Sequence, residues 1–246
     1  MKLQLKPLFY IILIHVCFLT SCLSSAQHQE DERLVSYEID LTTQTLKFYS
    51  KDSNNSNYGS IENLKTHLKY NNQKLIFAMN GGMYLKNGSP QGLYIEDGVQ
   101  KTPIDTLKKT SGNFYLQPNG IFYITKNNNG FVCESSNFPS NAEVTYATQS
   151  GPMLVIDHKI HSKFTRGSKN LHIRNGVGIL PNGNLLFAMS KDRINFFDFA
   201  EFFKSNGCKN ALYLDGFVSR TYLPKKKWEQ LDGDFGVIIA ETEAMN

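Results

Sequence analysis

The sequence predicts an α+β fold in a single domain, made mostly of antiparallel or mixed β-sheet with a few helices packed on it. Many short segments alternate apolar and polar residues or form brief apolar runs, as strands do. Asn-Gly and Asp-Gly turns separate them. Only residues 60–71 and 195–207 combine a suitable cap with apolar side chains at helical spacing. Short strands with two helices are typical of α+β proteins.

The N-terminal part is expected to direct export. A basic start precedes an apolar stretch, 7–19, that is too short to span a bilayer comfortably. The small residues before Cys22 resemble a bacterial lipobox, so residues 1–21 would be a signal peptide and Cys22 would carry lipid. Residues 22–33 would then be a polar tether, and 34–246 the globular domain. Ordinary signal cleavage a few residues later, or an uncleaved anchor, are the alternatives.

The charge and cysteine content argue against a nucleic-acid-binding protein and against a catalytic thiol. The chain has 26 Lys and Arg against 22 Asp and Glu, a formal net charge of +4, which is too mild to indicate a nucleic-acid-binding protein. An oxidising compartment allows a disulfide between Cys133 and Cys208. Their positions, in an expected strand and just after an expected helix, favour two buried free thiols. Neither has the histidine neighbour expected of a catalytic thiol.

The first half of the domain reads as hairpins around one helix. Segments 34–39 and 45–49 alternate in polarity and predict an antiparallel hairpin. After the first helix, a buried strand at 74–79 runs straight into Asn80-Gly81-Gly82, where two glycines allow a tight turn or a close approach of the backbone to a ligand.

More hairpins are expected after this motif. Residues 92–98 predict a strand with a turn at its end. Segments 113–116 and 121–124 flank a Pro-Asn-Gly turn, which is a strong hairpin signal. A turn at 126–130 then leads into a strand through Cys133. The aromatic residues of these segments favour a core role.

A strand, a special turn and a second strand occupy residues 144–156. The turn is Gln149-Ser150-Gly151-Pro152. Asp157, His158 and His161 follow it and have side chains that ligate metals, but no third clear partner is visible. We therefore expect no metal and no other cofactor.

Two strand segments of the second half carry polar groups. In the strand predicted at 172–179, Arg174 lies on the more polar face, so we expect it to point into a cleft. A short apolar run, 211–214, predicts a buried strand that ends at Asp215-Gly216, with Ser219 and Arg220 close behind. A plain Asp-Gly turn is the alternative to a functional carboxylate. Further strands are predicted at 185–189 and 235–240.

Four short motifs occur in an order that resembles the phosphodiester glycosidase family. They are Asn80-Gly81-Gly82-Met83-Tyr84, Gln149-Ser150-Gly151-Pro152-Met153-Leu154, Arg174-Asn175-Gly176-Val177-Gly178, and Leu214-Asp215-Gly216 with Ser219. The resemblance covers nearly all of the chain after Leu34 and is strongest to the bacterial, exported branch. It implies removal of a sugar from a phosphate-linked diester. Many members have glycines where this chain has Phe217 and Val218, which would narrow a related pocket.

Cleavage of a sugar-1-phosphodiester needs fewer catalytic groups than cleavage of an ordinary glycoside. Ordinary glycosidases protonate a poor leaving group with a second carboxyl, whereas a phosphate monoester, with a second pKa of about 6, departs with less help. We assign Asp215 as the catalytic base or charge stabiliser, with Arg174 and Asn80 as the other catalytic residues. Arg174 and Arg220 suit the phosphate. Asn80, Gln149 and Ser219 are expected to hold sugar hydroxyls or water. Backbone amides at Gly81, Gly82 and Gly151 are expected to form an anion nest. The neighbouring residues expected in the substrate site are Ser150, Asn175 and Gly216.

The sequence therefore predicts an exported hydrolase that cleaves a sugar-1-phosphodiester in phosphate-linked glycans or cell-envelope polysaccharide. The expected partners are that carbohydrate and, through Cys22, a membrane of the bacterial cell envelope; no nucleic acid is expected. Two alternatives stay open. One is a phosphodiesterase that breaks the P–O bond, which usually recruits metal. The other is a non-catalytic lipoprotein that binds a phosphoglycan.

Overall fold

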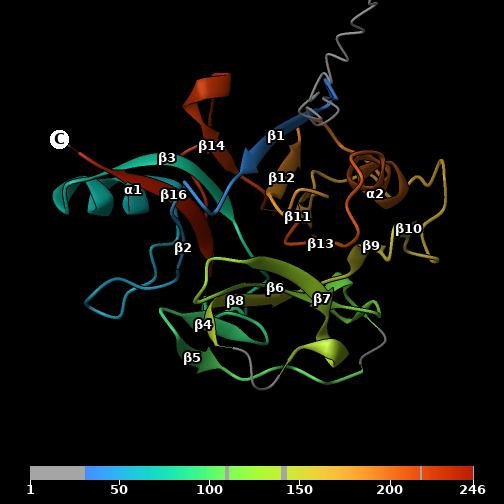
Figure 1. Cartoon of the computed structure of the whole chain (residues 1–246), viewed down its shortest axis with the longest axis horizontal. Coiled ribbons are helices and arrows are strands. Elements are labelled where there is room, and N and C mark those ends of the chain that lie inside the picture. The colour runs from blue at the N-terminus through green and yellow to red at the C-terminus, as the bar shows by residue number, and fades with distance from the viewer. Residues whose placement is uncertain (1–30, 109–110, 140–142, 217, 246) are drawn as a thin grey trace, which may run out of the picture.

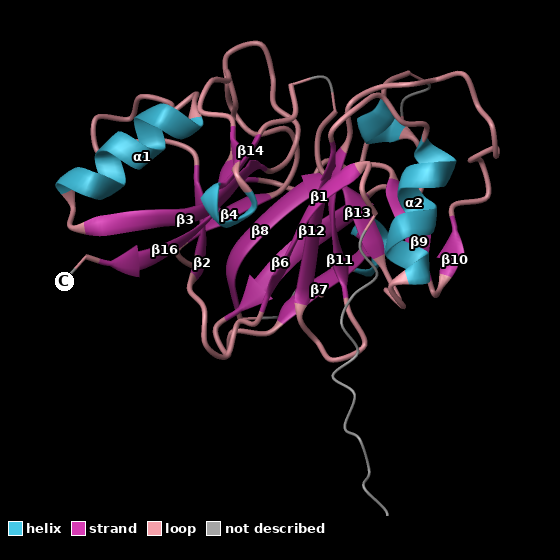
Figure 2. Cartoon of the chain, turned by 90° about the horizontal axis from the view of Figure 1, so that it is seen from above, coloured by secondary structure: helices cyan, strands magenta, loops and turns pink. Residues whose placement is uncertain are grey.

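The computed structural model describes residues 31–108, 111–139, 143–216 and 218–245. Within them the chain folds into three β-sheets that surround a common core, and a helix covers the outer face of two of the sheets (Figures 1 and 2). The predicted α+β class with mostly antiparallel sheet is confirmed. The expected signal peptide, Cys22 and most of the tether lie outside the described residues. In the described part, no helix is both long and apolar enough to cross a bilayer.

The first sheet has six strands, each antiparallel to its neighbours. Their spatial order is β1 (Leu34–Ile39), β12 (Leu185–Ser190), β11 (Asn175–Ile179), β13 (Ala211–Tyr213), β9 (Met153–Ile156) and β10 (Lys159–Ile160). Helix α2 (Phe196–Ser205) packs on its outer face (Figure 1). Asn195 caps this helix, as predicted, because its Oδ1 accepts a hydrogen bond from the Asp198 amide at 2.8 Å.

The second sheet has five antiparallel strands and carries the other helix. Their order is β15 (Trp228–Glu229), β14 (Thr221–Leu223), β3 (Gln73–Asn80), β16 (Ile238–Ala244) and β2 (Leu46–Tyr49). Helix α1 (Ile61–Tyr70) buries Ile61, Leu64 and Leu68 against it. These are the residues that the helical spacing indicates, and Ser60 caps the helix by accepting from the Asn63 amide at 3.2 Å.

The third sheet also has five antiparallel strands. Their order is β5 (Val99–Thr102), β4 (Tyr94–Glu96), β8 (Val144–Ser150), β6 (Gly120–Thr125) and β7 (Gly130–Glu134). Three short 3-10 helices, Asn113–Tyr115, Ser135–Asn137 and Pro224–Lys226, lie in the connections. The predicted turn at Asp97-Gly98 and the hairpin before Cys133 are confirmed. Cys133 and Cys208 are free thiols, as predicted, but only Cys208 is buried and Cys133 is half-buried.

The common core explains why several strands are apolar on both faces. In β12, Leu185, Phe187 and Met189 point into the core shared by the three sheets, whereas Leu186 and Ala188 face α2. A strand covered on both sides reads as a continuous apolar run. Buried on both faces, β12 also brings its neighbour β11 into the interior, where the polar residues discussed below lie.

Two predicted hairpins are wrong. Strand β1 pairs with β12 and strand β2 pairs with β16, so the first two strands lie in different sheets. Residues 113–115 form a 3-10 helix, and β6 pairs with β7 and β8. Alternating polarity identifies a half-buried strand but not its partner, and consecutive strands are neighbours in only about two-thirds of cases. The strand predicted at 172–179 begins at Asn175, and the last strand runs from Ile238 to Ala244.

Candidate functional site

Three strand ends from two sheets meet at one place. Asn80 is the last residue of β3, Asn175 is the first residue of β11, and Asp215 follows β13 by two residues. Strands β11 and β13 are paired in the first sheet, with Gly176 opposite Tyr213. Strand β3 belongs to the second sheet. The sequence motifs that end these strands are therefore brought together by the packing of one sheet edge on another.

Side-chain amides join the three strand ends. Asn175 Nδ2 donates to the main-chain oxygen of Asn80 at 2.8 Å and to its Oδ1 at 3.1 Å. Asn175 Oδ1 accepts from the Asp215 amide at 2.8 Å, and Asn80 Oδ1 accepts from the Arg220 amide at 2.9 Å. Asn80 is 1% exposed and Asn175 is 0% exposed. Because a buried amide contributes only when it is paired, this network fixes the backbone that carries Asp215.

The Asp215 carboxyl titrates far from its ordinary range. Burial raises its pKa to about 7, although the Gly216 amide and the Asn80 side chain act in the opposite direction. Gly216 N–H donates to Asp215 Oδ1 at 2.7 Å. A carboxyl whose pKa lies near neutrality can exchange a proton at physiological pH, which is what acid–base catalysis requires.

Asn80 also has an unused donor beside this carboxyl. Its Nδ2 is buried and has no hydrogen-bond partner among the described residues. It lies close enough to Asp215 to lower the pKa of that carboxyl. A buried donor without a partner is costly in free energy, so this atom is suited to the Asp215 carboxylate itself, or to an oxygen of a ligand or of a bound water.

Asp215 opens onto a cavity of about 370 Å³. Its other described lining residues are Val218 and five residues of one segment, Met83, Tyr84, Leu85, Lys86 and Gln91. Burial, and then the charge of Asp215, raise the pKa of Tyr84. Sequence reasoning did not assign Lys86 or Gln91 to the site. The available signal was their position, because they directly follow the Asn-Gly-Gly motif and so lie at the same sheet edge.

Arg174 does not line this cavity, and its guanidinium lies against the start of α2. Its side chain is 0% exposed and its guanidinium stacks on the ring of Phe196, 3.5 Å from the ring centroid. Nε donates to Ile194 O at 2.9 Å, and Nη2 donates to Asn170 O at 3.0 Å. Nη1 is buried with no partner among the described residues. Burial lowers the pKa of this guanidinium, while the neighbouring Tyr213 raises it. The polar strand face therefore packs against α2.

Tyr213 explains why glycine follows Asp215. A Cβ placed on Gly216 would lie 1.5 Å from the Tyr213 hydroxyl oxygen, a distance that no side chain can occupy. The phenol thus supports the turn from below. Ser219 holds the same turn, because its one hydroxyl hydrogen lies between two acceptors, Asp215 O at 2.7 Å from Oγ and Gly216 O at 2.9 Å. These contacts hold the backbone of the turn that carries the Asp215 carboxyl.

Arg220 is engaged with Asp232. Its Nε and Nη2 each donate to one carboxylate oxygen of Asp232 at 2.7 Å. This bidentate pair occupies the edge of the guanidinium that would otherwise bind a phosphate. The main-chain amide of Arg220 nevertheless belongs to the site through its bond to Asn80.

The other residues that the sequence predicts for the site connect neighbouring elements through hydrogen bonds or close packing. Gln149 is fully buried, with Oε1 accepting from the Leu93 and Asp105 amides at 2.9 and 2.8 Å. Ser150 Oγ donates to Leu214 O. Gly81 N–H donates to Val237 O at 3.0 Å. Gly82 has φ +105°, and a Cβ there would lie 2.2 Å from Thr148 Oγ1. Gly151 packs on Asn119.

Metal-ligating side chains are dispersed in the described part of the chain, which has no group of three or more His, Cys, Asp or Glu that could hold an ion. His161, the histidine considered above, has both ring nitrogens engaged: Nε2 lies 3.0 Å from Gln117 O, and Nδ1 accepts from the Lys163 amide at 3.1 Å.

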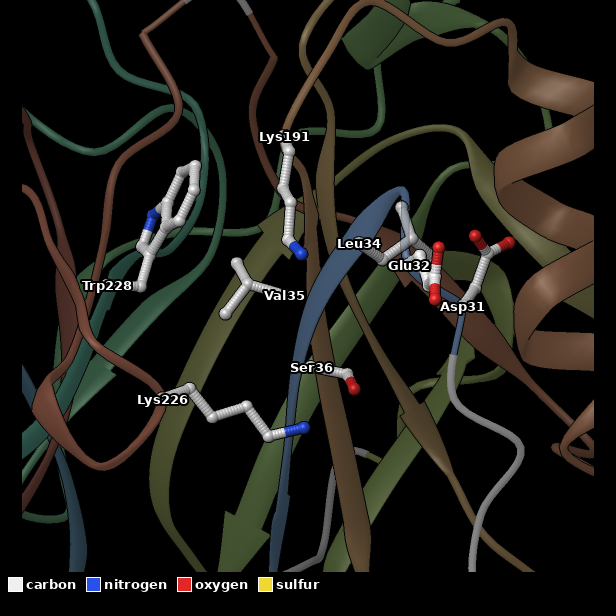
Figure 3. A pocket seen from close by; sticks show the side chains of 8 residues that line it. All are labelled: Asp31, Glu32, Leu34, Val35, Ser36, Lys191, Lys226 and Trp228. Carbon is white, nitrogen blue, oxygen red and sulfur yellow. The ribbon is translucent and has the colours of Figure 1, made fainter.

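Other cavities lie away from Asp215. One of about 210 Å³ lies beside β1 and is lined by Val35 and Ser36 of that strand and by Lys191, Lys226 and Trp228 (Figure 3). Another of about 550 Å³ lies beside β4 and β5 and includes Tyr94 and Glu96. Although the second is larger than the Asp215 cavity, it lacks the converging strand ends, so we place the site at Asp215.

Comparisons with known proteins identify the family of the chain. The family model for phosphodiester glycosidase matches residues 73–236, which contain Asn80, Asn175 and Asp215. The chain is 33% identical over 222 residues to the uncharacterized protein YigE of Escherichia coli (strain K12), covering 90% of this chain and 86% of that protein.

Solved structures show the same fold. One is the zebrafish N-acetylglucosamine-1-phosphodiester alpha-N-acetylglucosaminidase catalytic domain, auto-inhibited by its pro-peptide, with a TM-score of 0.56 and 16% identity over 87% of this chain and 84% of that one. Another is a hypothetical protein from Synechocystis, with a TM-score of 0.53 and 14% identity over 85% of this chain and 59% of that one. Together with the family match, these findings show that the chain belongs to the phosphodiester glycosidase family.

Proposed function

We propose that this chain is a hydrolase that cleaves the glycosidic bond of a sugar-1-phosphodiester, with Asp215 as its catalytic carboxyl. The observation that carries the proposal is a carboxyl with a pKa of about 7 that lines a cavity and is held by the Asn80–Asn175 network. Membership of the phosphodiester glycosidase family supports this reaction class.

In the proposed reaction, water attacks the anomeric carbon and gives a proton to Asp215. The bond between that carbon and the phosphate oxygen breaks, and its electron pair leaves with the phosphate monoester. Because this leaving group is already a weak base, one carboxyl in the cavity is sufficient. The Gly216 amide holds Asp215 Oδ1, and Asn80 Nδ2 is placed to hold the water or a sugar oxygen.

The proposed natural substrate is a phosphate-linked glycan of the bacterial cell envelope, and the proposed location is that envelope, through lipid at Cys22. The support for both is the apolar stretch before Cys22 and the lipobox that it resembles. Replacement of Cys22 by alanine should abolish labelling by a fatty-acid probe and move the protein out of the membrane fraction. Continued labelling of the variant would contradict the lipoprotein assignment.

The decisive experiment is hydrolysis of a panel of sugar-1-phosphodiesters in water enriched in oxygen-18. We expect release of reducing sugar, with the heavy oxygen on the sugar. Label on the phosphate would instead show P–O cleavage, as in a phosphodiesterase. Saturable binding without turnover would identify a non-catalytic phosphoglycan-binding protein. Asp215→Asn, purified in parallel, is the control for contaminating activity.

A further inference from the structure

We propose that Lys86 is the cation that holds the phosphate of the substrate, so that the sugar lies toward Asp215 and the aglycone toward the hairpin formed by residues 84–90. The site would thereby select anionic phosphodiesters over neutral glycosides. This inference rests on the proposed function, and it differs from the assignment of the phosphate to Arg174 and Arg220 that the sequence suggests.

Few positively charged side chains lie near the Asp215 cavity. Among its described lining residues, Lys86 has the one positively charged side chain. Arg174 is fully buried and donates to main-chain oxygens behind the strand. Arg220 is paired on two sides with Asp232. Lys86 is exposed and forms no ion pair within the described residues, so its ammonium is available to an anion.

The chain presents this lysine on a tight turn. The Leu85 amide donates to Ser89 O at 2.9 Å, and the Gly88 amide donates back to Leu85 O at 2.8 Å. Lys86 and Asn87 are thus the two central residues of a tight turn. Gly88 has φ +76°, and a Cβ there would lie 1.9 Å from Asn57 Nδ2. The turn is therefore packed on its neighbours and places Lys86 at a defined position.

The base of the hairpin is held equally closely. The Gln91 amide donates to Met83 O at 2.8 Å, and Gln91 Nε2 donates to the Tyr115 hydroxyl at 3.1 Å. Gly236 lies directly under Tyr84, since a Cβ on Gly236 would lie 2.4 Å from the Tyr84 Cβ. The segment that carries Lys86 and Tyr84 therefore has ordered supports, and both residues line the same cavity as Asp215.

The charge of Asp215 also bears on this assignment. A phosphodiester is an anion, and the ionised form of Asp215 repels it across a small cavity. A lysine that lines the same cavity can offset this repulsion without contacting the reacting carbon. Lysine binds phosphate as a compact point charge, which suits a leaving group whose oxygens must be held but whose ester substituent varies.

The test compares Lys86→Gln and Lys86→Arg with the control Lys159→Gln, which alters an exposed lysine on β10. Substrates are an aryl phosphodiester of a sugar-1-phosphate and the corresponding aryl glycoside without phosphate. We expect Lys86→Gln to lower kcat/KM for the diester about 10- to 100-fold, the loss that fits one charged hydrogen bond. The kcat/KM for the neutral glycoside, or its Ki if it is not hydrolysed, should stay within about twofold.

Two further readouts separate a charge effect from a structural one. Added salt should weaken diester hydrolysis by the wild type and Lys159→Gln more than by Lys86→Gln, and Lys86→Arg should retain most activity. Equal changes on both substrates, or none on the diester, would overturn the assignment. If the wild type hydrolyses no diester, the proposed function fails separately. Calorimetric binding of a sugar-1-phosphate ester then decides: loss in Lys86→Gln alone supports Lys86, and any other pattern overturns it.

Discussion

Two regions surround the Asp215 carboxyl, and they are built differently. The frame, defined as Asn80, Asn175, Arg174 and the Asp215–Gly216 turn, is densely hydrogen-bonded; Asn80, Asn175 and Arg174 are buried, and Asp215 is half-buried. The hairpin of residues 84–90 forms the facing wall and has an exposed tip. The frame contains five residues of the family motifs. The hairpin contributes Tyr84, Leu85 and Lys86 to the cavity lining, and Met83 and Gln91, which flank it, also line the cavity. From this difference we propose that the frame positions the chemistry and that the hairpin selects the substrate.

Removing the charge of Asp215 should have the largest effect of any change to the frame. Asp215→Asn keeps the shape of the side chain, and loss of a positioned general base typically costs about 100- to 10,000-fold in rate. We expect that loss in kcat with the fold intact. Steady-state kinetics and thermal melting, measured on the same preparation, check it. A variant with near-normal turnover would make Asp215 a turn residue and leave the hairpin wall without a catalytic partner.

The pH dependence of the frame follows from the raised pKa of Asp215. If the carboxylate is the base, kcat/KM should fall about tenfold per pH unit below pH 7 and level off above it; a rise toward acid pH would instead make Asp215 an acid. Stability should change in the opposite sense. The folded protein binds this proton more tightly than the unfolded chain, whose carboxyl titrates near 3.8. The contribution of this carboxyl to stability is therefore greatest at low pH and falls as pH rises from about 4 to 7.

Asp215→Asn should remove this pH dependence of stability. The variant and the wild type should melt at similar temperatures near pH 4, and the variant should melt higher above pH 7, where the wild type bears the full cost of the buried charge. The difference should be on the order of 1–4 kcal/mol in the free energy of unfolding. Parallel melting curves at every pH would show that the carboxyl is not held in its buried setting.

Asn175→Ala tests the link between the two sheets. It removes the partners of the Asp215 amide and of the Asn80 main-chain oxygen, each of which costs about 1–3 kcal/mol if left unpaired in the interior. We expect the free energy of unfolding to fall by about 2–5 kcal/mol in urea titrations. Lys86→Gln, at the hairpin tip, should change it by less than about 0.5 kcal/mol. Similar losses in the two variants would erase the distinction between frame and hairpin.

Arg174→Lys separates the two interpretations of this arginine. Lysine keeps the charge but cannot reproduce the planar stack on Phe196 or the separate bonds to Ile194 and Asn170. As part of the frame, Arg174 should affect the phosphodiester and the neutral glycoside alike, with a several-fold fall in kcat/KM on each. A fall confined to the diester would return Arg174 to the phosphate role that the sequence suggests, and would weaken the case for Lys86.

Much of this arrangement could be predicted from the sequence, and the rest depended on long-range packing. Local patterns identified both helices, their caps and most strands, because each is decided within a few residues. The partners of β1 and β2 could not be predicted, since pairing is set by sheets that assemble across the whole chain. The motifs singled out Asp215 because they are local. Alternation of polarity could not show that the polar face of β11 packs on α2, because that contact also depends on long-range packing.

The smallest expected effect is that of chelation. The carboxyl of Asp215 already has one oxygen on the Gly216 amide, and the residues that the structure describes provide no cluster of three or more His, Cys, Asp or Glu around it. The hydrolysis proposed here needs one carboxyl and one cation, and Lys86 supplies the cation. We therefore expect incubation with EDTA to leave kcat/KM for a sugar-1-phosphodiester within about twofold of the untreated value, a margin that repeated assays resolve. Loss of activity that a single divalent ion restores would place a metal where Lys86 is assigned. In that case the hairpin would be a wall around a metal site, and Asp215 would be one of its ligands.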